Sequence, residues 1–366
     1  MSVLRVGIMS TAAIATKNRR AIVAAGLRVT AVASRDQSRA QAWADAALAC
    51  GDLPAPIRAH GSYEALLADE EVDAVYMPLP CGLHLPWVLA CAKAGKHVLV
   101  EKPAAMNVEE LETMVRACRD SNVVLLDGTM FHHHPRMAKI GEALHGGRLG
   151  ELGRVVSAFS FRGDEGFFAN NIRTKSELER FGCLGDLAQY SIRFGLFVFA
   201  WELPATVRAV AHRRNEAGVP MDVSATFSWP TGGPDGGPRT MIVDAAFTLA
   251  FRQFAEVVGT KGTLSVRDFV ISRTHAACEH EVIDEPGLDA AHSNVVGAEE
   301  RVRSGGNQEA AMWRAFAAQA QGAGFRAEWA RWTLATQACL DAAMVSMANG
   351  GAETPVARPA MFGGEL

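Results

Sequence analysis

Residues 96–103 read KHVLVEKP, an apolar run that ends abruptly in a glutamate, a lysine and a proline. The proline has no backbone N–H and a fixed φ, so it ends the hydrogen-bond ladder of a strand at this point. Ligands of parallel sheets bind beyond the carboxyl ends of the strands. The stretch therefore predicts a buried strand that delivers Glu101 and Lys102 to a ligand crevice.

The segments around this strand repeat one pattern, in which a short apolar run precedes a helix-compatible stretch. The apolar runs lie at 4–9, 28–34, 72–80, 96–103 and 123–129, and helical patterns lie at 36–49, 63–69, 85–95 and 108–120. Near-continuous apolar strands are typical of a parallel sheet with helices on both faces. We therefore predict a doubly wound α/β domain, a Rossmann domain, over residues 1–128.

The pattern changes after residue 150. Strand-like segments joined mostly by turns follow at 154–163, 205–214, 222–229, 240–251, 254–268 and 270–274, with one helix-like interval at 182–200. This order predicts an α+β domain with a large, mainly antiparallel open sheet over residues 129–366. The segment 305–348 has Ala, Met and Trp at helical spacing, and we expect core helices there, with room for them to pack back on the first domain.

Composition narrows the class of protein. The formal net charge of -4 offers no broad basic surface, so we expect no nucleic-acid partner. The seven cysteines form no CxxC pair, and the N-terminus MSVLRVGIMS lacks the features of an export signal. No stretch approaches about eighteen uninterrupted apolar residues, so we expect a cytoplasmic protein that does not enter a membrane.

The first strand-to-helix turn has Gly7, Met9 and Ala12 where a dinucleotide fingerprint has G-x-G-x-x-G/A. Met9 breaks the motif, but a turn before a helix still presents free N–H groups to an anion. The next strand ends in Ser34 and Arg35, where an NAD site usually has an acid. A guanidinium pairs with a 2′-phosphate, which favours NADP over NAD. Asp36 either reaches a ribose or caps the following helix.

Four blocks of sequence resemble the Gfo/Idh/MocA family, which is named after glucose-fructose oxidoreductase, inositol dehydrogenase and rhizopine catabolism proteins. The blocks are VGIMSTAAIA (6–15), AGKHVLVEKP (94–103), MFHHHPRM (130–137) and GCLGDLAQYSIRF (182–194). The resemblance implies a Rossmann domain that binds NAD or NADP, and a second domain that covers the substrate and forms homodimers or homotetramers through its sheet. It also implies a catalytic role for Lys102 and a cis peptide bond before Pro103.

The resemblance, carried over residue by residue, also predicts the cofactor contacts. These fall on Gly7, Ser10, Thr11, Ala12, Ile14, Ser34, Arg35, Pro78, Pro80, His84, Glu101 and Lys102. The P-x-x-x-H spacing of Pro80 and His84 is similar to the segment that meets the nicotinamide half in the family.

In the second domain, Asp186 and Tyr190 are four residues apart, so on a helix they share one face, with Arg193 close to it. Many family members have His at the later position, and Tyr190 resembles the branch of dihydrodiol dehydrogenases and NADP-dependent xylose dehydrogenases, where a tyrosine is the proposed acid/base. A phenol with a pKa of about 10 needs a nearby cation such as Lys102 to act as a base. In the opposite assignment Lys102 shuttles the proton and Tyr190 orients the substrate.

Substrate contacts are expected from residues far apart in the sequence. The candidates are His133, Arg136, Phe161, Arg162, Asp164, Phe168, Asn170 and Arg193. The triplet at 132–134 invites a metal hypothesis, but three successive side chains diverge and no HExxH spacing accompanies them, so we expect no metal.

These observations predict an oxidoreductase that uses NADP, with NAD as the other possible cofactor. It moves a hydride between nicotinamide and a hydroxyl-bearing carbon of a sugar, cyclic polyol or dihydrodiol. One alternative is reduction of a keto sugar or a nucleotide-linked keto sugar. Another is a non-catalytic NADP sensor, against which the presence of Lys102, Asp186 and Tyr190 argues.

Overall fold

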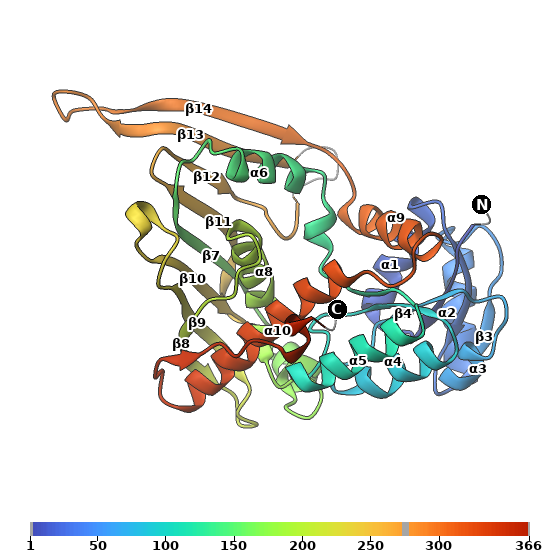
Figure 1. Cartoon of the computed structure of the whole chain (residues 1–366). Coiled ribbons are helices and arrows are strands. Elements are labelled where there is room, and N and C mark those ends of the chain that lie inside the picture. The colour runs from blue at the N-terminus through green and yellow to red at the C-terminus, as the bar shows by residue number, and fades with distance from the viewer. Residues whose placement is uncertain (1–2, 273–277, 365–366) are drawn as a thin grey trace. The chain divides into compact units, whose positions relative to one another are not determined.

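The computed structural model describes residues 3–272 and 278–364, which form two compact units (Figure 1). The first unit contains Met1–His133, Asn307–Leu334 and Met361–Leu366, and the second contains His134–Gly306 and Ala335–Ala360. Two C-terminal segments thus belong to the unit that is built mainly from the start of the chain. We propose that the domain boundary lies near residue 130, with these two segments added to the first domain.

The first unit is built on a six-stranded parallel sheet of order β3-β2-β1-β4-β5-β6. The strands are β1 (Arg5–Met9), β2 (Arg28–Ala33), β3 (Arg58–His60), β4 (Ala74–Met77), β5 (His97–Val100) and β6 (Leu125–Asp127). The interior strands are apolar because both faces are covered; in β5 the residues 98–100 have no exposed surface. The predicted Rossmann architecture is confirmed.

Helices surround this sheet in the first unit. They are α1 (Ala13–Ala24), α2 (Gln37–Ala49), α3 (Tyr63–Leu67), α4 (His84–Lys93), α5 (Val108–Asp120) and α9 (Gln308–Ala320), with short turns η1 (Cys81–Leu83), η2 (Met130–His133) and η6 (Ala360–Gly363). The helix α10 (Ala327–Ala348) contains the division between the two units. α9 is contributed by the far end of the chain, yet it packs on α1 and η2.

The second unit is a nine-stranded sheet of order β14-β13-β12-β11-β7-β10-β9-β8-β15 (Figure 1). The strands are β7 (Leu152–Arg162), β8 (Thr206–Arg214), β9 (Pro220–Trp229), β10 (Arg239–Ala246), β11 (Thr248–Gly259), β12 (Gly262–Val266), β13 (Cys278–Leu288), β14 (Val295–Ser304) and β15 (Thr354–Pro355). All described neighbours pair antiparallel except β7 and β10, which are parallel. The predicted mainly antiparallel sheet is confirmed.

Helical segments cover one face of this sheet, as Figure 1 shows for α6 and α8. The helical segments of this unit are α6 (Arg136–His145), α7 (Glu165–Asn170), η3 (Ile172–Thr174), η4 (Leu184–Ala188), α8 (Gln189–Val198) and η5 (Pro234–Gly236), the last in the loop between β9 and β10. α8 packs on β7, β10 and β11. Gly195 permits the close approach, because a Cβ there would collide with Met241 Sδ of β10.

Some predicted strand boundaries were wrong. The segment 240–251 contains all but the first residue of β10 and the start of β11, and 254–268 contains the end of β11 and all of β12. Residues 270–272 form no strand, and 273–274 lie outside the described residues. The strands β3, β13 and β14 were missed, since β13 and β14 are rich in charged, exposed residues that give no apolar run. None of the described helices combines the length and apolar character that a membrane span requires.

Candidate active site

The turn between β1 and α1 has the features of an anion-binding turn. Ser10 has φ 146°, a backbone conformation that favours glycine, and its Oγ accepts a hydrogen bond from Ala12 N at 3.1 Å. α1 begins at Ala13, and its N-cap residue, Ala12, makes no side-chain hydrogen bond to the helix. Ala15 N donates to Ala12 O at 2.9 Å, which leaves the N–H groups of Ala13 and Ile14 at the start of α1 for a phosphate.

The other residues expected near the phosphates differ in placement. Gly7 lies inside β1, where a Cβ would come within 3.0 Å of the Leu66 and Val72 side chains, so its small size serves the packing of the sheet. Thr11 is half-buried in the turn, whereas Ile14 is 39% exposed in the first turn of α1. Direct contact of these residues with a cofactor stays a prediction.

Ser34 and Arg35 follow β2, as the sequence predicted. Asp36 caps α2 by accepting hydrogen bonds from Ser38 N at 2.8 Å and Ser38 Oγ at 2.6 Å, and these bonds lower the pKa of Asp36. Asp36 thus has the capping role, and its contact with a ribose stays a prediction. Burial raises the pKa of Tyr63, and the charges of Arg35 and Arg39 oppose that rise. Two guanidinium groups therefore lie near Tyr63 at this end of the sheet.

Glu101 and Lys102 follow β5 directly, at the carboxyl edge of the sheet. The Lys102–Pro103 peptide bond is cis, as the resemblance implied. The Glu101 carboxylate accepts hydrogen bonds from the Tyr76 hydroxyl at 2.6 Å and from Lys102 N at 3.3 Å. Gly128 leaves room for it, because a Cβ there would lie 3.2 Å from Glu101 Oε2. The acid before Lys102 is thus held from several sides.

His84 corrects one of the predicted cofactor contacts. It is 1% exposed, and its ring nitrogens lie 2.9 Å from Ala104 O and 2.8 Å from Leu79 O. Both nitrogens therefore face backbone carbonyl groups, of which the neutral ring can donate to one, and the ring lies between the turn after β4 and the turn after Pro103. Burial lowers the pKa of His84, and the carbonyl contacts oppose this shift without overcoming it. Of the nearby prolines predicted to meet the cofactor, Pro78 is buried and Pro80 is half-buried.

In the second unit, Asp186 and Tyr190 lie on consecutive segments of different geometry. Asp186 is in the π-helical turn η4, while Tyr190 is in α8, so a purely α-helical face was too simple a prediction. Asp186 Oδ1 pairs with Arg173 Nε at 2.7 Å, a partner that the sequence did not suggest. Tyr190 is 6% exposed, and its ring lies 6.0 Å from that of Phe159.

Two predicted substrate contacts have buried guanidinium groups with partners in the protein. Arg136 is 1% exposed; its guanidinium pairs with Asp268 Oδ1 at 2.7 Å and donates to the carbonyls of Asp268 and Phe269. Arg193 is 3% exposed, and its Nε donates to Thr336 Oγ1 at 2.7 Å. Both guanidinium groups are thus buried and bonded to other groups of the protein, and contact of Arg136 or Arg193 with a substrate stays a prediction.

The three consecutive histidines point to different neighbours. The His132 ring lies 4.3 Å from that of Trp332, and the His133 ring 6.0 Å from that of Trp329. His134 Nδ1 accepts from Arg136 N, and its Nε2 lies 3.3 Å from Cys278 Sγ. Within residues 3–272 and 278–364, no group of three or more His, Cys, Asp or Glu is placed to hold a metal.

The remaining substrate candidates gather at the end of β7. A pocket of about 510 Å³ is lined by Phe161, Arg162, Asp164 and Asn170, together with Gly163, Gly166, Phe167 and Asn171. Asp164 also caps α7 by accepting from Phe167 N at 2.7 Å. Phe168 does not line this pocket, although its ring contacts that of Phe167 at 5.5 Å.

Comparison with known families agrees with this geometry. Residues 4–129 match an oxidoreductase family with an NAD-binding Rossmann fold, and residues 137–265 match the GFO/IDH/MocA C-terminal domain. The chain belongs to the Gfo/Idh/MocA oxidoreductase family. The predicted enzyme class and the resemblance are therefore confirmed.

Individual members of the Gfo/Idh/MocA family cover most of the chain. A D-xylose 1-dehydrogenase (NADP(+)) of Haloferax volcanii is 35% identical over 74% of this chain and 78% of its own. Trans-1,2-dihydrobenzene-1,2-diol dehydrogenase of Mus musculus is 32% identical over 72% and 74%. A 3-ketoreductase from Actinomadura kijaniata, solved with TDP-benzene and NADP, has 25% identity and a TM-score of 0.79, over 94% of this chain and 98% of that one.

Several contacts of the site were missed from the sequence of this Gfo/Idh/MocA protein. Arg39 carried only a weak signal, because it lies in the first turn of α2 while Arg35 lies before the Asp36 cap, outside the helix. Arg173 and Tyr76 carried none, since their partners Asp186 and Glu101 are set by tertiary structure.

We predict that His84→Gln weakens the acid sensitivity of folding. The folded pKa of His84 lies below its unfolded value, so the wild-type chain loses stability as pH falls below about 6.5, where only the unfolded state takes up the proton. Urea unfolding at pH 7.5 and pH 5.5 measures the loss, which should be smaller in His84→Gln. The exposed His212→Gln is the control, and an equal loss in wild type and His84→Gln would contradict the assignment.

Proposed function

We propose that this chain is an NADP-preferring oxidoreductase that transfers a hydride between nicotinamide and a hydroxyl-bearing carbon of a sugar, cyclic polyol or dihydrodiol. The observation that carries the proposal is the carboxyl edge of the first sheet, where Lys102 follows the buried β5 and the uncapped start of α1 follows β1. Parallel sheets bind ligands at this edge.

The bound cofactor supplies or accepts the hydride, and the protein handles the proton. We assign that proton to Lys102 and Tyr190, either with Tyr190 as acid/base and Lys102 as the cation that favours its ionised form, or with the roles reversed. We assign a supporting catalytic role to Asp186, which pairs with Arg173 and stands four residues before Tyr190 in the chain. For the Actinomadura 3-ketoreductase, both a lysine-to-alanine and a tyrosine-to-phenylalanine variant have been solved with TDP-benzene and NADP.

NADP preference is supported by charge at the end of β2. Arg35 and Arg39 place two cations near Tyr63, beyond the end of β2, and the Asp36 carboxylate caps α2 through its Oδ1 atom. A guanidinium attracts the 2′-phosphate that distinguishes NADP from NAD.

Reduction of a nucleotide-linked keto sugar is the second candidate function. Two relatives named dTDP-3,4-didehydro-2,6-dideoxy-alpha-D-glucose 3-reductase, from Streptomyces violaceoruber and Streptomyces antibioticus, are 30% and 31% identical over 72% and 74% of this chain. The pocket beside Phe161 would then receive part of a larger substrate.

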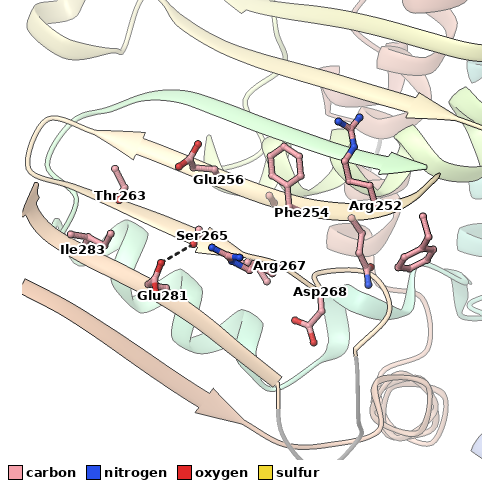
Figure 2. A pocket seen from close by; sticks show the side chains of 13 residues that line it. Arg252, Phe254, Glu256, Thr263, Ser265, Arg267, Asp268, Glu281 and Ile283 are labelled. Carbon is pink, nitrogen blue, oxygen red and sulfur yellow. Dashed lines mark hydrogen bonds between the residues drawn. The ribbon is translucent and has the colours of Figure 1, made fainter. Parts of the chain in front are cut away.

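We also propose that two copies associate through the second sheet. The face opposite α8 carries Ile242 at 37% and Val210 at 44% exposure, which are large apolar side chains for a solvent face. Figure 2 shows a pocket of about 660 Å³ on this face, where Arg252 and Arg267 lie among Glu256 and Glu281. A patch with both signs of charge suits a two-fold contact with its own copy.

A cytoplasmic location fits the cysteines. None of the seven forms a disulfide bond, and burial raises the pKa of Cys118 to about 12 and raises that of Cys339 as well. Cysteines outside disulfides are usual in a reducing compartment.

We expect Lys102→Ala and Tyr190→Phe each to lower kcat by about a hundredfold or more while NADP binding survives, because each removes a proton-transfer group. Absorbance at 340 nm, with NAD and NADP against aldoses, cyclic polyols, dihydrodiols and keto sugars, first identifies a substrate. Lys93→Ala, at an exposed site on α4, is the matched control. Unchanged turnover in both variants would end the proposed mechanism, and no turnover of any substrate by the wild type would end the proposed function.

Arg35→Asp should lower kcat/KM for NADP by about ten to a hundredfold and spare NAD, because a charge-assisted hydrogen bond to a phosphate is worth about 1.5–3 kcal/mol. Initial rates with each cofactor measure the ratio. Arg28→Asp, exposed at the other end of β2, makes the same charge change away from the site. Equal losses with both cofactors would contradict the assignment.

Ile242→Lys should shift the protein from dimer or tetramer toward monomer in sedimentation velocity, because it buries a charge in the proposed interface. Val345→Lys, at a 49% exposed position on α10, should leave the mass unchanged. A monomeric wild type would contradict the interface.

A further inference from the structure

Three buried side chains of the first unit form a line of hydrogen bonds that ends at Glu101, the half-buried acid before Lys102. Trp313 Nε1 of α9 donates to Asn18 Oδ1 of α1 at 3.0 Å. Asn18 Nδ2 donates to the Tyr76 hydroxyl of β4 at 2.7 Å, and that hydroxyl donates to Glu101 Oε1 at 2.6 Å. Trp313 and Tyr76 have no exposed surface and Asn18 has 3%.

The chemistry of the donors fixes the direction of this line. An indole N–H can only donate, so it sets the Asn18 amide with its oxygen toward Trp313 and its nitrogen toward Tyr76. The Tyr76 oxygen accepts from that nitrogen, which leaves its hydrogen for Glu101. Every hydrogen therefore points toward Glu101, as an ionised carboxylate requires. Hydrogen bonds in such a line polarise one another in the same sense.

The end of the line is placed beside the proposed proton-handling residue. The second oxygen of Glu101 accepts from Lys102 N at 3.3 Å and is within 3.2 Å of where a Gly128 Cβ would stand. Asn18 lies in the second turn of α1, the helix whose first turn faces the proposed phosphate site. The line thus joins the cofactor-binding helix to the strand end that carries Lys102.

We propose that Trp313, Asn18 and Tyr76 are positioning residues that hold the Glu101 carboxylate ionised and oriented next to Lys102. This inference rests on the proposed function, in which Lys102 takes part in proton transfer. A cluster that served only to fill the core would need no polar atoms, since apolar groups of the same shape pack as well without desolvation cost.

The test uses two variants that keep the shape of the core. Tyr76→Phe removes only the hydroxyl. Asn18→Asp offers Tyr76 a second carboxylate, so its hydrogen no longer has to point to Glu101. Each should lower kcat with NADP on the order of ten to a hundredfold and leave KM for both substrates within about twofold, because geometry at the reacting atoms is lost and not binding.

The double variant separates positioning from general damage. If Tyr76 and Asn18 act through one carboxylate, Tyr76→Phe with Asn18→Asp should be no slower than the worse single variant, whereas independent effects would multiply. Thr30→Val is the control. Thr30 lies on β2, away from this line, and the variant removes the hydrogen bond that its hydroxyl donates to Glu71 O at 2.8 Å. Multiplying losses, or unchanged kcat in both folded single variants, would overturn the proposal.

A crystal structure of Tyr76→Phe with NADP keeps this test independent of turnover. The expected result is a Glu101 carboxylate that has left its place next to Lys102 N; a carboxylate in its original place would overturn the positioning role. If the wild type turns over no substrate, the proposed function fails, while this structure still decides whether Tyr76 orients Glu101.

Discussion

The burial of β5 on both faces is the constraint on which the rest of this structure depends. A strand without exposed side chains cannot carry charges along its length, so its polar residues collect where it leaves the sheet. Glu101 and Lys102 stand at that point, directly before Pro103. The same edge holds the start of α1, so one sheet gathers an anion-binding turn and an ammonium group from distant parts of the sequence.

Such an edge supplies only half of an enzyme. In the proposed function it positions a dinucleotide and a cation, and we assign substrate choice to the second unit, which contains Tyr190 and the pocket beside Phe161. This division is consistent with the named relatives, which share the family yet act on xylose, a dihydrodiol or a dTDP-linked sugar. The names of these relatives all describe a dehydrogenase or a reductase, and they differ in the substrate.

The sequence predicted well those features that are local. Apolar runs between helical stretches gave the parallel sheet, and the EKP tripeptide located Lys102 at its edge. Features set by tertiary contact were not accessible. No sequence pattern near Arg136 indicates that Asp268 is its buried partner. The motif position of His84 likewise does not indicate that both of its ring nitrogens face backbone carbonyls. β13 and β14 escaped because a hairpin rich in exposed charge shows no hydrophobic period.

The placement of α9 has a consequence for how this chain is synthesised. Trp313 fills a space between α1 and β4, 295 residues away from Asn18 in sequence. While the ribosome is still synthesising the second sheet, the first unit therefore has all of its strands but lacks α9. The first unit can complete its core only when nearly the whole polypeptide has emerged, and the second unit also needs residues after 334. Until then the apolar surface that α9 covers is exposed, which would favour binding by chaperones.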